Sequence, residues 1–576
     1  MLGFGRARSN QRNFELSCIK DARPYDASAT TWVCKVWFKW AVVGLGLLVL
    51  HCWRLTSSPP GFFLDEASVG YNAYAISVDG RDEHGEAWPL FFRTFGEYKN
   101  PVTIYLTAGA MRLVGPSVAI VRLIPSLLSF LTAVLLALLV RGLFESQCLA
   151  LATLATLGIL PWLFVIGRIG FEVAALPPFL AGFLLVWWKA QNRAAGNASD
   201  MDKGLGRWSV AGLSVLAGLL LGLSVYTYAT GRLYVGLLVV GLWIGYVGHW
   251  RRQGLALVSL TVVVMLAYVP LIVWGSRHPG ALTGRFEFLS ILCHPAATCR
   301  AYPDLAVSIA EDSRPSLLVA AERFVRVYSA AWSPSFLFYS GDPWGRHVTG
   351  RGGMLFMSLA PLLPLGVAAL WRSRAAPFWR FIALASLLGP VPASLTMHLG
   401  HGLRTIETVP FLALIMALGA FETWRALGNQ RWLSLGLATL LVVEMSNFLG
   451  DYFTSYPSRQ RVFFDPGFQE AIATARAAAH MVPILLSQNA GDGYPDIAYA
   501  FFTAEEPKAW RSSGVAGGGA RTVKLDGAPL RPGAVVITKP DERVSDAEPV
   551  RTITFPVQDG WGHTRQEPVY RIWRTK

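Results

Sequence analysis

Long runs of residues without charge recur along the chain and predict helices that span a membrane. Each of the clearest runs contains at most one charged side chain, and these runs are Val118–Val140, Cys148–Ile166, Trp208–Gly231, Gly254–Ser276 and Gly352–Trp371. Since a helix needs roughly 20 apolar residues to cross the hydrocarbon core, each run is long enough to do so. A soluble protein could bury one such run, but their repetition predicts an α-helical polytopic membrane protein.

Counting all apolar runs predicts about eleven transmembrane helices. Their predicted starts lie near Val36, Val118, Cys148, Glu172, Trp208, Leu233, Gly254, Gly352, Phe381, Arg404 and Trp432. The first run ends near Trp53 with no small-residue cleavage site after it, so we interpret it as a retained anchor and not a signal peptide. An odd number of spans places the two termini on opposite sides of the membrane.

Three long segments lack the composition of a span, namely residues 54–117, 277–351 and 450–576. Parity places all three on the outer face of the membrane. We therefore divide the chain into a basic cytoplasmic tail (1–35), a transmembrane domain (36–449) that includes the first two segments as outer loops, and an extracytoplasmic domain (450–576). An enzyme that works at the outer face needs such segments more than a channel or carrier does.

Local signals predict two helices in the first outer loop. Small and aromatic residues over 66–77 indicate a short helix. Residues 101–114 indicate a second helix, with Pro101 in its first turn and Gly115 at its end. This second helix is short for a span and fits the membrane interface.

The C-terminal segment has the pattern of a small α/β domain. Residues 468–480 indicate a helix, 482–487 and 534–538 indicate buried strands, and 496–502 fits either a strand or a helix. The glycine-rich run GVAGGGAR (514–521) lacks the Lys-Ser/Thr that follows a phosphate-binding loop, so we interpret it as a linker.

Composition and charge agree with the membrane prediction. Of the 576 residues, 53% are hydrophobic and only 15% are charged, against about a quarter in soluble domains. The formal net charge of +14 would also fit nucleic-acid binding, but the basic residues lie in short loops that alternate with loops of mixed charge. This positive-inside pattern predicts a multi-pass protein of the cell (inner or plasma) membrane with a cytoplasmic N-terminus and no nucleic-acid partner.

The cysteines predict one disulfide bond and no zinc cluster. Cys293 and Cys299 share the second outer loop in the run CHPAATC, where an oxidising compartment favours a bond between them, with two free thiols as the alternative. The chain contains no CxxC pair, which structural zinc sites usually require.

Two adjacent carboxylates follow the first span. Asp65 and Glu66 come directly after an apolar Phe-Phe-Leu run, in the segment PPGFFLDEASVGY. One interpretation is structural, with Asp65 as the N-cap of the following helix. The other is chemical, because a carboxylate at the membrane surface can act on a substrate hydroxyl.

This segment resembles the first outer loop of the type C glycosyltransferases, the superfamily of protein O-mannosyltransferases and lipid A aminoarabinose transferases. Those enzymes carry an Asp-Glu pair after the first span, then a short helix, then a Tyr-x-Lys-Pro-Pro-like element that opens a second helix. The pair here is Asp65-Glu66 and the element is Tyr98-Lys99-Asn100-Pro101. The sequence departs from the pattern because Tyr98 and Lys99 are adjacent and Asn100 replaces the first Pro. The resemblance covers the membrane region and its topology, but not the C-terminal domain.

The resemblance implies an inverting transfer of a sugar from a polyprenyl-phosphate donor to an acceptor hydroxyl at the outer face. Asp65 would be the general base, Glu66 its support and Glu172 a further carboxylate, while Lys99 and Tyr98 would contact the donor phosphate. The acceptor would be a protein, lipid or glycan, as in protein glycosylation or lipid A modification, and the bilayer would hold the polyprenyl chain. The cofactor stays open, a divalent cation included.

Further basic residues lie at span ends on the outer face, where the positive-inside rule does not place them. Arg168, Arg346, His347 and Arg404 are therefore candidates for substrate binding, although arginines at span ends also extend to lipid headgroups. Glu172 is one helical turn from Arg168, which suggests an ion pair. We expect no metal at His398 and His401, which fit polar surface.

Two other functions remain as alternatives. A transporter or flippase of a lipid-linked glycan would carry functional charges at the membrane midplane, whereas most charges here lie near span ends, with Glu407 and Glu444 as exceptions. A scaffold without catalytic activity would have no use for Asp65 and Lys99.

Overall fold

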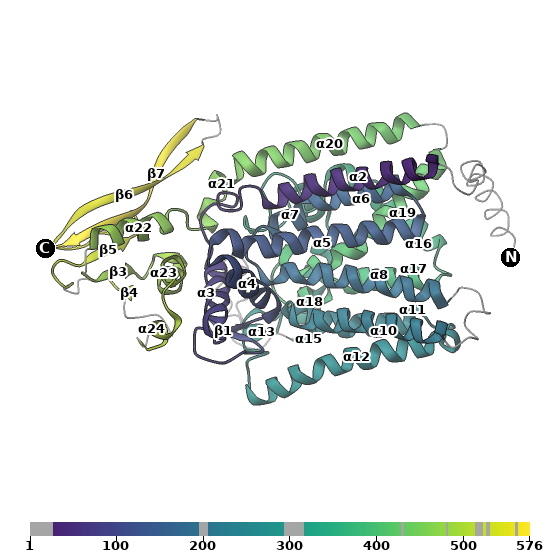
Figure 1. Cartoon of the computed structure of the whole chain (residues 1–576), viewed down its shortest axis with the longest axis horizontal. Helices are drawn as coiled ribbons and strands as arrows, with labels where there is room; N and C mark the ends of the chain where they lie inside the picture. Colours follow the sequence, from purple (N-terminus) through teal and green to yellow (C-terminus); the bar gives the residue numbers. More distant parts are fainter. Residues whose placement is uncertain are drawn as a thin grey trace.

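The protein is a bundle of long helices with a mixed α/β domain at one end (Figure 1). This computed structural model describes residues 27–194, 205–292, 316–427, 431–479, 482–512, 522–525, 530–558 and 563–576. The expected Cys293–Cys299 disulfide and the glycine-rich run 514–521 lie outside the described residues.

A helix begins within a few residues of most predicted span starts; the exceptions are Val36, which lies inside α2, and Gly352, which lies in the loop before α16. The helices of the bundle are α2 (Ala27–Cys52), α5 (Val118–Phe144), α6 (Gln147–Ile159), α7 (Pro161–Gly167), α8 (Leu176–Ala194), α10 (Leu205–Leu223), α11 (Ala229–Gly245), α12 (Trp250–Arg277), α16 (Leu362–Arg372), α17 (Pro377–Leu388), α19 (Val409–Leu427) and α20 (Arg431–Thr454). By length and composition, 6 helices of the described chain could cross a membrane, or 7 if α6 and α7 form one bent span. Shorter apolar stretches lie at Trp37–Cys52 within α2, at Ala229–Gly245 and at Met357–Arg372. The count of eleven therefore stays a prediction.

The break between α6 and α7 follows from the sequence Leu160-Pro161. The two helices are bent by 47° relative to each other, and Pro161 occupies the first turn of α7, where its missing N–H costs nothing. Because of the bend, α6 ends at Ile159, and α7 leads into the turn Gly167–Phe171. This turn contacts the first outer loop, since Gly170 N–H donates to Glu66.

The two predicted outer loops lie at the same end of the bundle as the C-terminal domain (Figure 1). The first contains α3 (Leu64–Asp79), β1 (Phe92–Thr94), β2 (Glu97–Lys99) and α4 (Pro101–Val114), and the second contains α13 (Gly284–Leu289) and α15 (Leu317–Ala331). The predicted helix 101–114 is confirmed. Phe95 and Gly96 both have positive φ, of 48° and 76°, as the two-residue hairpin turn between β1 and β2 requires.

The C-terminal domain is the predicted small α/β unit. It contains α22 (Phe468–Ala479), β3 (Ile484–Ser487), α23 (Pro495–Thr503), α24 (Pro507–Ser512), β4 (Thr522–Val523), β5 (Val535–Thr538), β6 (Ala547–Gln558) and β7 (Thr564–Thr575). The sheet order is β4-β3-β5-β7-β6, with β3 parallel to β4 and β5, and β7 antiparallel to its neighbours. The segment left open between strand and helix is the helix α23.

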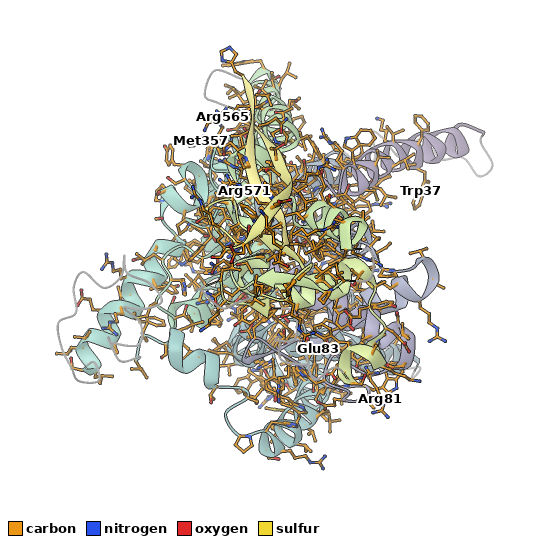
Figure 2. The ribbon with its side chains drawn as sticks, turned by 90° about the vertical axis from the view of Figure 1, so that its left-hand side faces the viewer. Trp37, Arg81, Glu83, Met357, Arg565 and Arg571 are labelled. Carbon is orange, nitrogen blue, oxygen red and sulfur yellow. The ribbon has the colours of Figure 1, made fainter. Side chains whose placement is uncertain are left out.

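Strands β6 and β7 form a long hairpin that the sequence pattern did not predict, and Arg565 and Arg571 lie on β7 (Figure 2). Pro549 and Pro556 interrupt the pattern of β6, and proline usually argues against a strand. It is tolerated here because β6 is an edge strand.

Aromatic stacking joins the C-terminal domain to the first outer loop. The rings of Phe62 and Phe501 stack with centroids 4.9 Å apart, and Phe62 N–H donates to the carbonyl of Phe464 at 2.8 Å. A Cβ on Gly70 would lie 2.8 Å from the Phe501 ring, so glycine allows α3 to approach α23. Helix α3 is therefore held between the bundle and the domain.

Candidate functional site

A cavity of about 490 Å³ lies where the first outer loop meets the ends of the bundle helices. Its walls come from the start of α3, the β2–α4 junction, the start of α11 and the loops around residues 344–347 and 392–404. The predicted site residues in its lining are Asp65, Tyr98, Lys99, Glu172, Arg346, His347 and Arg404. The fold thus gathers residues from five separate parts of the chain.

Asp65 and Lys99 form an ion pair in this cavity. Lys99 Nζ donates to Asp65 Oδ1 at 2.9 Å and to Glu97 Oε1 at 2.6 Å. Burial lowers the pKa of Lys99, but the carboxylates of Asp65 and Glu172 outweigh this effect and raise its pKa above the ordinary value. Lys99 therefore stays protonated. The side chain of Asp65 is 27% exposed and lines the cavity.

The structural interpretation of Asp65 as a helix cap is wrong. Helix α3 begins at Leu64 with Phe63 as its N-cap residue, so Asp65 lies inside the first turn. The side chain that caps the helix belongs to Glu66, whose Oε2 accepts from Phe63 N–H at 3.0 Å. Successive helical side chains point about 100° apart, so Asp65 and Glu66 face different surroundings.

Glu66 is fully buried against α5 and away from the cavity lining. Its carboxylate accepts from Arg122 Nε at 2.7 Å, from Arg122 Nη2 at 2.8 Å and from Gly170 N–H at 2.9 Å. The remaining Arg122 donors bind carbonyl oxygens of the loop after α2, those of Leu55, Pro59 and Gly61. The single charge in the apolar run of α5 is thus neutralised by Glu66, which fixes α3 to the bundle.

Arg168 also lies outside the cavity lining, where backbone carbonyl groups surround its guanidinium. It donates to the carbonyls of Leu50 at 2.8 Å, His51 at 3.1 Å and Ser58 at 3.2 Å, and also to Trp53. Its Nε donates to Tyr452 Oη at 3.3 Å. These contacts satisfy the guanidinium within the bundle, and none of them involves Glu172.

Glu172 instead binds Asn100, the residue at which the sequence departs from the family pattern. Its carboxylate accepts from the backbone N–H of Asn100 and from Asn100 Nδ2, the latter at 3.1 Å. Proline at this position would offer neither donor. Asn100 Oδ1 in turn accepts from Arg232 Nη2 at 2.9 Å, so the departure creates a chain of contacts along one wall of the cavity.

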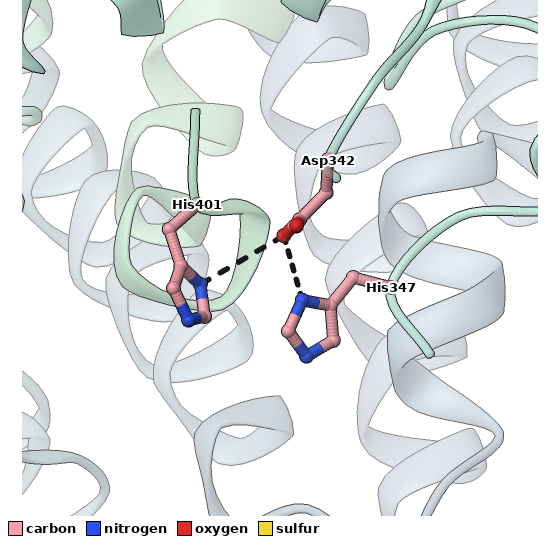
Figure 3. Close-up of side chains that lie close together, drawn as sticks. All are labelled: Asp342, His347 and His401. Atoms are coloured by element: carbon pink, nitrogen blue, oxygen red, sulfur yellow. Dashed lines mark hydrogen bonds and ion pairs between the residues drawn. The ribbon is translucent and has the colours of Figure 1, made fainter. Parts of the chain in front are cut away.

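A carboxylate behind the cavity contacts two histidines that line it and is hydrogen-bonded to one of them, His347. Asp342 is buried, and its Oδ2 accepts from His347 Nδ1 at 2.6 Å and lies 3.8 Å from His401 Nδ1. The Nε2 side of each ring therefore points away from Asp342 (Figure 3). Asp342 thus fixes the tautomer of His347, which presents Nε2 on the far side of its ring.

These same three residues could hold a metal ion, since one ligand atom from each lies within 4.8 Å of the others. Two histidines and a carboxylate suit zinc and related divalent ions. In the arrangement described, however, Asp342 Oδ2 also accepts from Gly402 N–H at 2.6 Å. A metal at this oxygen would have to replace the hydrogen bond from His347.

Two further cations of the lining, Arg404 and Arg346, have contacts of their own. Arg404 donates to Thr396 Oγ1 at 2.7 Å and lies 2.9 Å from His398 Nδ1. The guanidinium of Arg346 lies 3.8 Å from the centre of the ring of Phe63, the N-cap residue of α3. Arg232 also belongs to this lining but was not among the predicted site residues. It lies at the predicted outer end of a span, and the same position made Arg404 a candidate.

The chain resembles known proteins in its fold and not in its sequence. No protein-family model matches the chain, and no curated protein sequence matches it. The structure is similar to that of ArnT from Cupriavidus metallidurans in the apo state, with 13% identity, 95% of this chain and 98% of that chain covered, and a TM-score of 0.53. It is equally similar to ArnT bound to undecaprenyl phosphate, with 12% identity, coverage of 92% and 98%, and a TM-score of 0.53.

A third solved structure is more distant. The oligosaccharyltransferase AglB from Archaeoglobus fulgidus, in complex with an inhibitory peptide and a dolichol-phosphate, matches with 13% identity and a TM-score of 0.47 over 82% of this chain and 60% of that one. The ArnT match confirms the expected helical membrane fold with a small C-terminal domain: the chain shares the fold of ArnT over 95% of its length, while the number of spans stays a prediction.

Proposed function

We propose that this protein is a membrane glycosyltransferase that transfers a sugar from a polyprenyl-phosphate donor to an acceptor hydroxyl. The observation that carries the proposal is the Asp65–Lys99 ion pair at the wall of a cavity that also contains Arg346 and Arg404. This arrangement combines a base with cations for a phosphate. The ArnT fold supports it, since one ArnT structure contains undecaprenyl phosphate.

The chemistry follows from these groups as an inverting displacement. The acceptor hydroxyl gives its proton to Asp65, and its oxygen forms a bond to the anomeric carbon of the donor. The bond between that carbon and the phosphate oxygen breaks on the opposite side, and the electron pair stays on the phosphate. Lys99 and Arg404 stabilise the charge that develops on this leaving group.

Lys99 couples donor binding to the activation of Asp65. In the structure described, its ammonium group is shared between Asp65 and Glu97. A donor phosphate that draws Lys99 toward itself weakens the contact with Asp65, and this raises the basicity of the carboxylate. The base would thus become active when the donor is bound.

The other residues support this site in different ways. His347, oriented by Asp342, binds the substrate through Nε2, and Tyr98 and Arg346 contribute further contacts. Glu172 holds Asn100 and the start of α4. Glu66 supports the site by fixing the start of α3.

We place the reaction at the outer face of a cell (inner or plasma) membrane, with the C-terminal domain outside. The acceptor is a protein, lipid or glycan. The transporter alternative is less well supported, because the charged groups gather at one end of the bundle around the cavity.

The test is a transfer assay on the purified full-length protein with a panel of radiolabelled polyprenyl-phosphate sugars. Asp65→Asn should lower turnover by roughly two to four orders of magnitude, because the amide cannot accept the proton. Its melting temperature should stay near that of the parent, since Asp65 does not cap the helix. The matched control is Glu86→Gln, an exposed carboxylate of the same loop, which should keep full turnover. A folded Asp65→Asn protein with near-normal transfer would refute the assignment.

A further inference from the structure

A second cavity, of about 910 Å³, opens beside the site and is lined almost entirely by apolar side chains. Its walls are α4, the end of α10 with Tyr226 after it, the middle of α12 and the segment Trp88–Leu90. Leu106, Leu219 and Leu266 in this lining are 44%, 48% and 62% exposed, so the groove opens toward the lipid side of the bundle. Its volume and apolar lining suit a hydrocarbon chain.

The groove and the polar cavity share two walls. At the start of α4, Asn100 lines the cavity, while the next residues, Pro101 and Val102, line the groove. At the turn before α11, Tyr226 lines the groove and Tyr228 lines the cavity. A molecule with an apolar tail and an anionic head could therefore occupy both.

Arg232 lies at this junction. Its guanidinium lies 4.8 Å from the centre of the Phe91 ring, which stacks on Tyr226 of the groove with centroids 6.0 Å apart. On its other side, Nη2 donates to Asn100 Oδ1 at 2.9 Å.

The Nε of Arg232 is buried and has no hydrogen-bond partner among the residues described. A buried donor without a partner is costly, and guanidinium donors suit phosphate oxygens. The unused donor therefore points to an anionic ligand.

We propose that Arg232 binds the phosphate of a polyprenyl phosphate at the mouth of the polar cavity, with the polyprenyl chain in the groove. This proposal rests on the proposed function and identifies where its lipid enters. Arg232 would contact the phosphate from the groove side, while Lys99 and Arg404 contact the same phosphate from within the cavity. A bulk phospholipid offers a similar phosphate, but its two acyl chains would have to share one groove, so we assign the site to the single chain of a polyprenyl lipid.

The experiment measures binding and needs no transfer, so that its failure is distinct from that of the proposed function. Full-length protein in lipid nanodiscs is titrated with a long-chain polyprenyl phosphate and with a short-chain analogue, geranyl phosphate. Arg232→Gln should weaken binding of both by roughly 10- to 100-fold, the usual effect of losing a charge-assisted hydrogen bond. The control is Arg277→Gln, an exposed arginine at the end of α12, which should bind both as the parent does.

A second pair of variants tests the groove independently of Arg232. Leu219→Trp fills the groove and should weaken binding of the long-chain phosphate by roughly 5-fold or more, with little change for geranyl phosphate. Leu216→Trp, one turn earlier on α10 and 44% exposed, should change neither.

Three outcomes would overturn the proposal. The first is equal binding by Arg232→Gln and Arg277→Gln. The second is equal long-chain binding by Leu219→Trp and Leu216→Trp. The third is competition by phosphatidylglycerol as effective as that by the polyprenyl phosphate, which would assign the site to bulk lipid.

Discussion

At the scale of single residues, cations that line the cavity are already held by neighbouring side chains. Lys99 lies between Asp65 and Glu97, and Arg404 lies between Thr396 and His398. Such contacts hold each cation in place before a phosphate arrives. Preorganised charge of this kind stabilises a leaving group without reorganisation during the reaction.

Replacing either cation should weaken use of the donor. Lys99→Ala and Arg404→Ala each remove a charge-assisted contact, which costs about 1.5–3 kcal/mol, or roughly 10- to 150-fold in donor affinity or turnover. Donor binding and initial rates measure the effect, with Arg81→Ala as the control because Arg81 is exposed and its side chain binds the carbonyl of Gly85 in its own loop. If both variants stay within about twofold of the parent, the phosphate site is elsewhere.

A buried carboxyl in the first outer loop should make stability depend on pH. Glu83 lies at the end of the molecule that carries the C-terminal domain (Figure 2), and its carboxylate accepts from Asn72 Nδ2 at 3.0 Å. Burial raises its pKa from 4.5 to about 7. The folded state thus holds a proton that the unfolded chain loses at lower pH, so stability falls as the pH rises from 4.5 toward 7.

Glu83→Gln should remove this dependence. The amide keeps the acceptor for Asn72 and cannot ionise, so the variant should gain roughly 3 kcal/mol relative to the parent between pH 4.5 and pH 8, as expected from a shift of this size. Melting temperatures of both proteins across this range measure the difference. Parallel curves would show that Glu83 is not the group responsible.

At the scale of elements, α3 is positioned by a buried ion pair with α5. Glu66 and Arg122 are both fully buried, and each has further hydrogen bonds to the backbone around it. The pair joins the start of α3, the loop after α2 and the turn after α7. Asp65, one residue away, reaches the cavity because this contact fixes the rotation of the helix.

Breaking the Glu66–Arg122 pair should lower the free energy of unfolding more strongly than it lowers the rate of sugar transfer. Glu66→Gln leaves Arg122 buried without its anion, which should lower the free energy of unfolding by roughly 3–5 kcal/mol. The protein that remains folded at low temperature should still transfer sugar at a rate far above that of Asp65→Asn. Equal activity losses in the two variants, with no change in the melting temperature of Glu66→Gln, would mean that Glu66 takes part in the reaction.

At the scale of the whole molecule, the outer loops and the C-terminal domain gather at one end of the bundle, opposite the start of α2 (Figure 1). The site lies at that end. A lipid-linked donor could therefore stay in the bilayer, while an acceptor reaches the cavity from the aqueous side.

The predicted topology can be checked with reporter fusions that are active only outside the cytoplasm. Fusions after Arg277 and after Gly450 should be active, and fusions after Lys203 and after Arg252 should be inactive, because the latter follow the basic loops. An active fusion at Lys203 would reverse the topology and place the site on the cytoplasmic face.

The sequence by itself determined the features that depend on local physics. A membrane helix satisfies its backbone hydrogen bonds within its own segment, so charge-free runs predict where helices lie. Proline and glycine at fixed positions likewise predicted α4 to the residue. The strands β3 and β5 were predicted because buried parallel strands are continuous apolar runs, whereas β6 was not, because only its place at the sheet edge makes its prolines acceptable.

Only the tertiary structure decided which charged residues share a site. Asp65 and Glu66 are neighbours in sequence, yet one faces the cavity and the other binds Arg122, because their side chains point apart on α3. Arg168 and Arg404 gave the same signal at span ends, but the carbonyls that enclose Arg168 come from residues 50–58, more than a hundred positions away. Such contacts depend on how distant segments pack, and no local pattern encodes them.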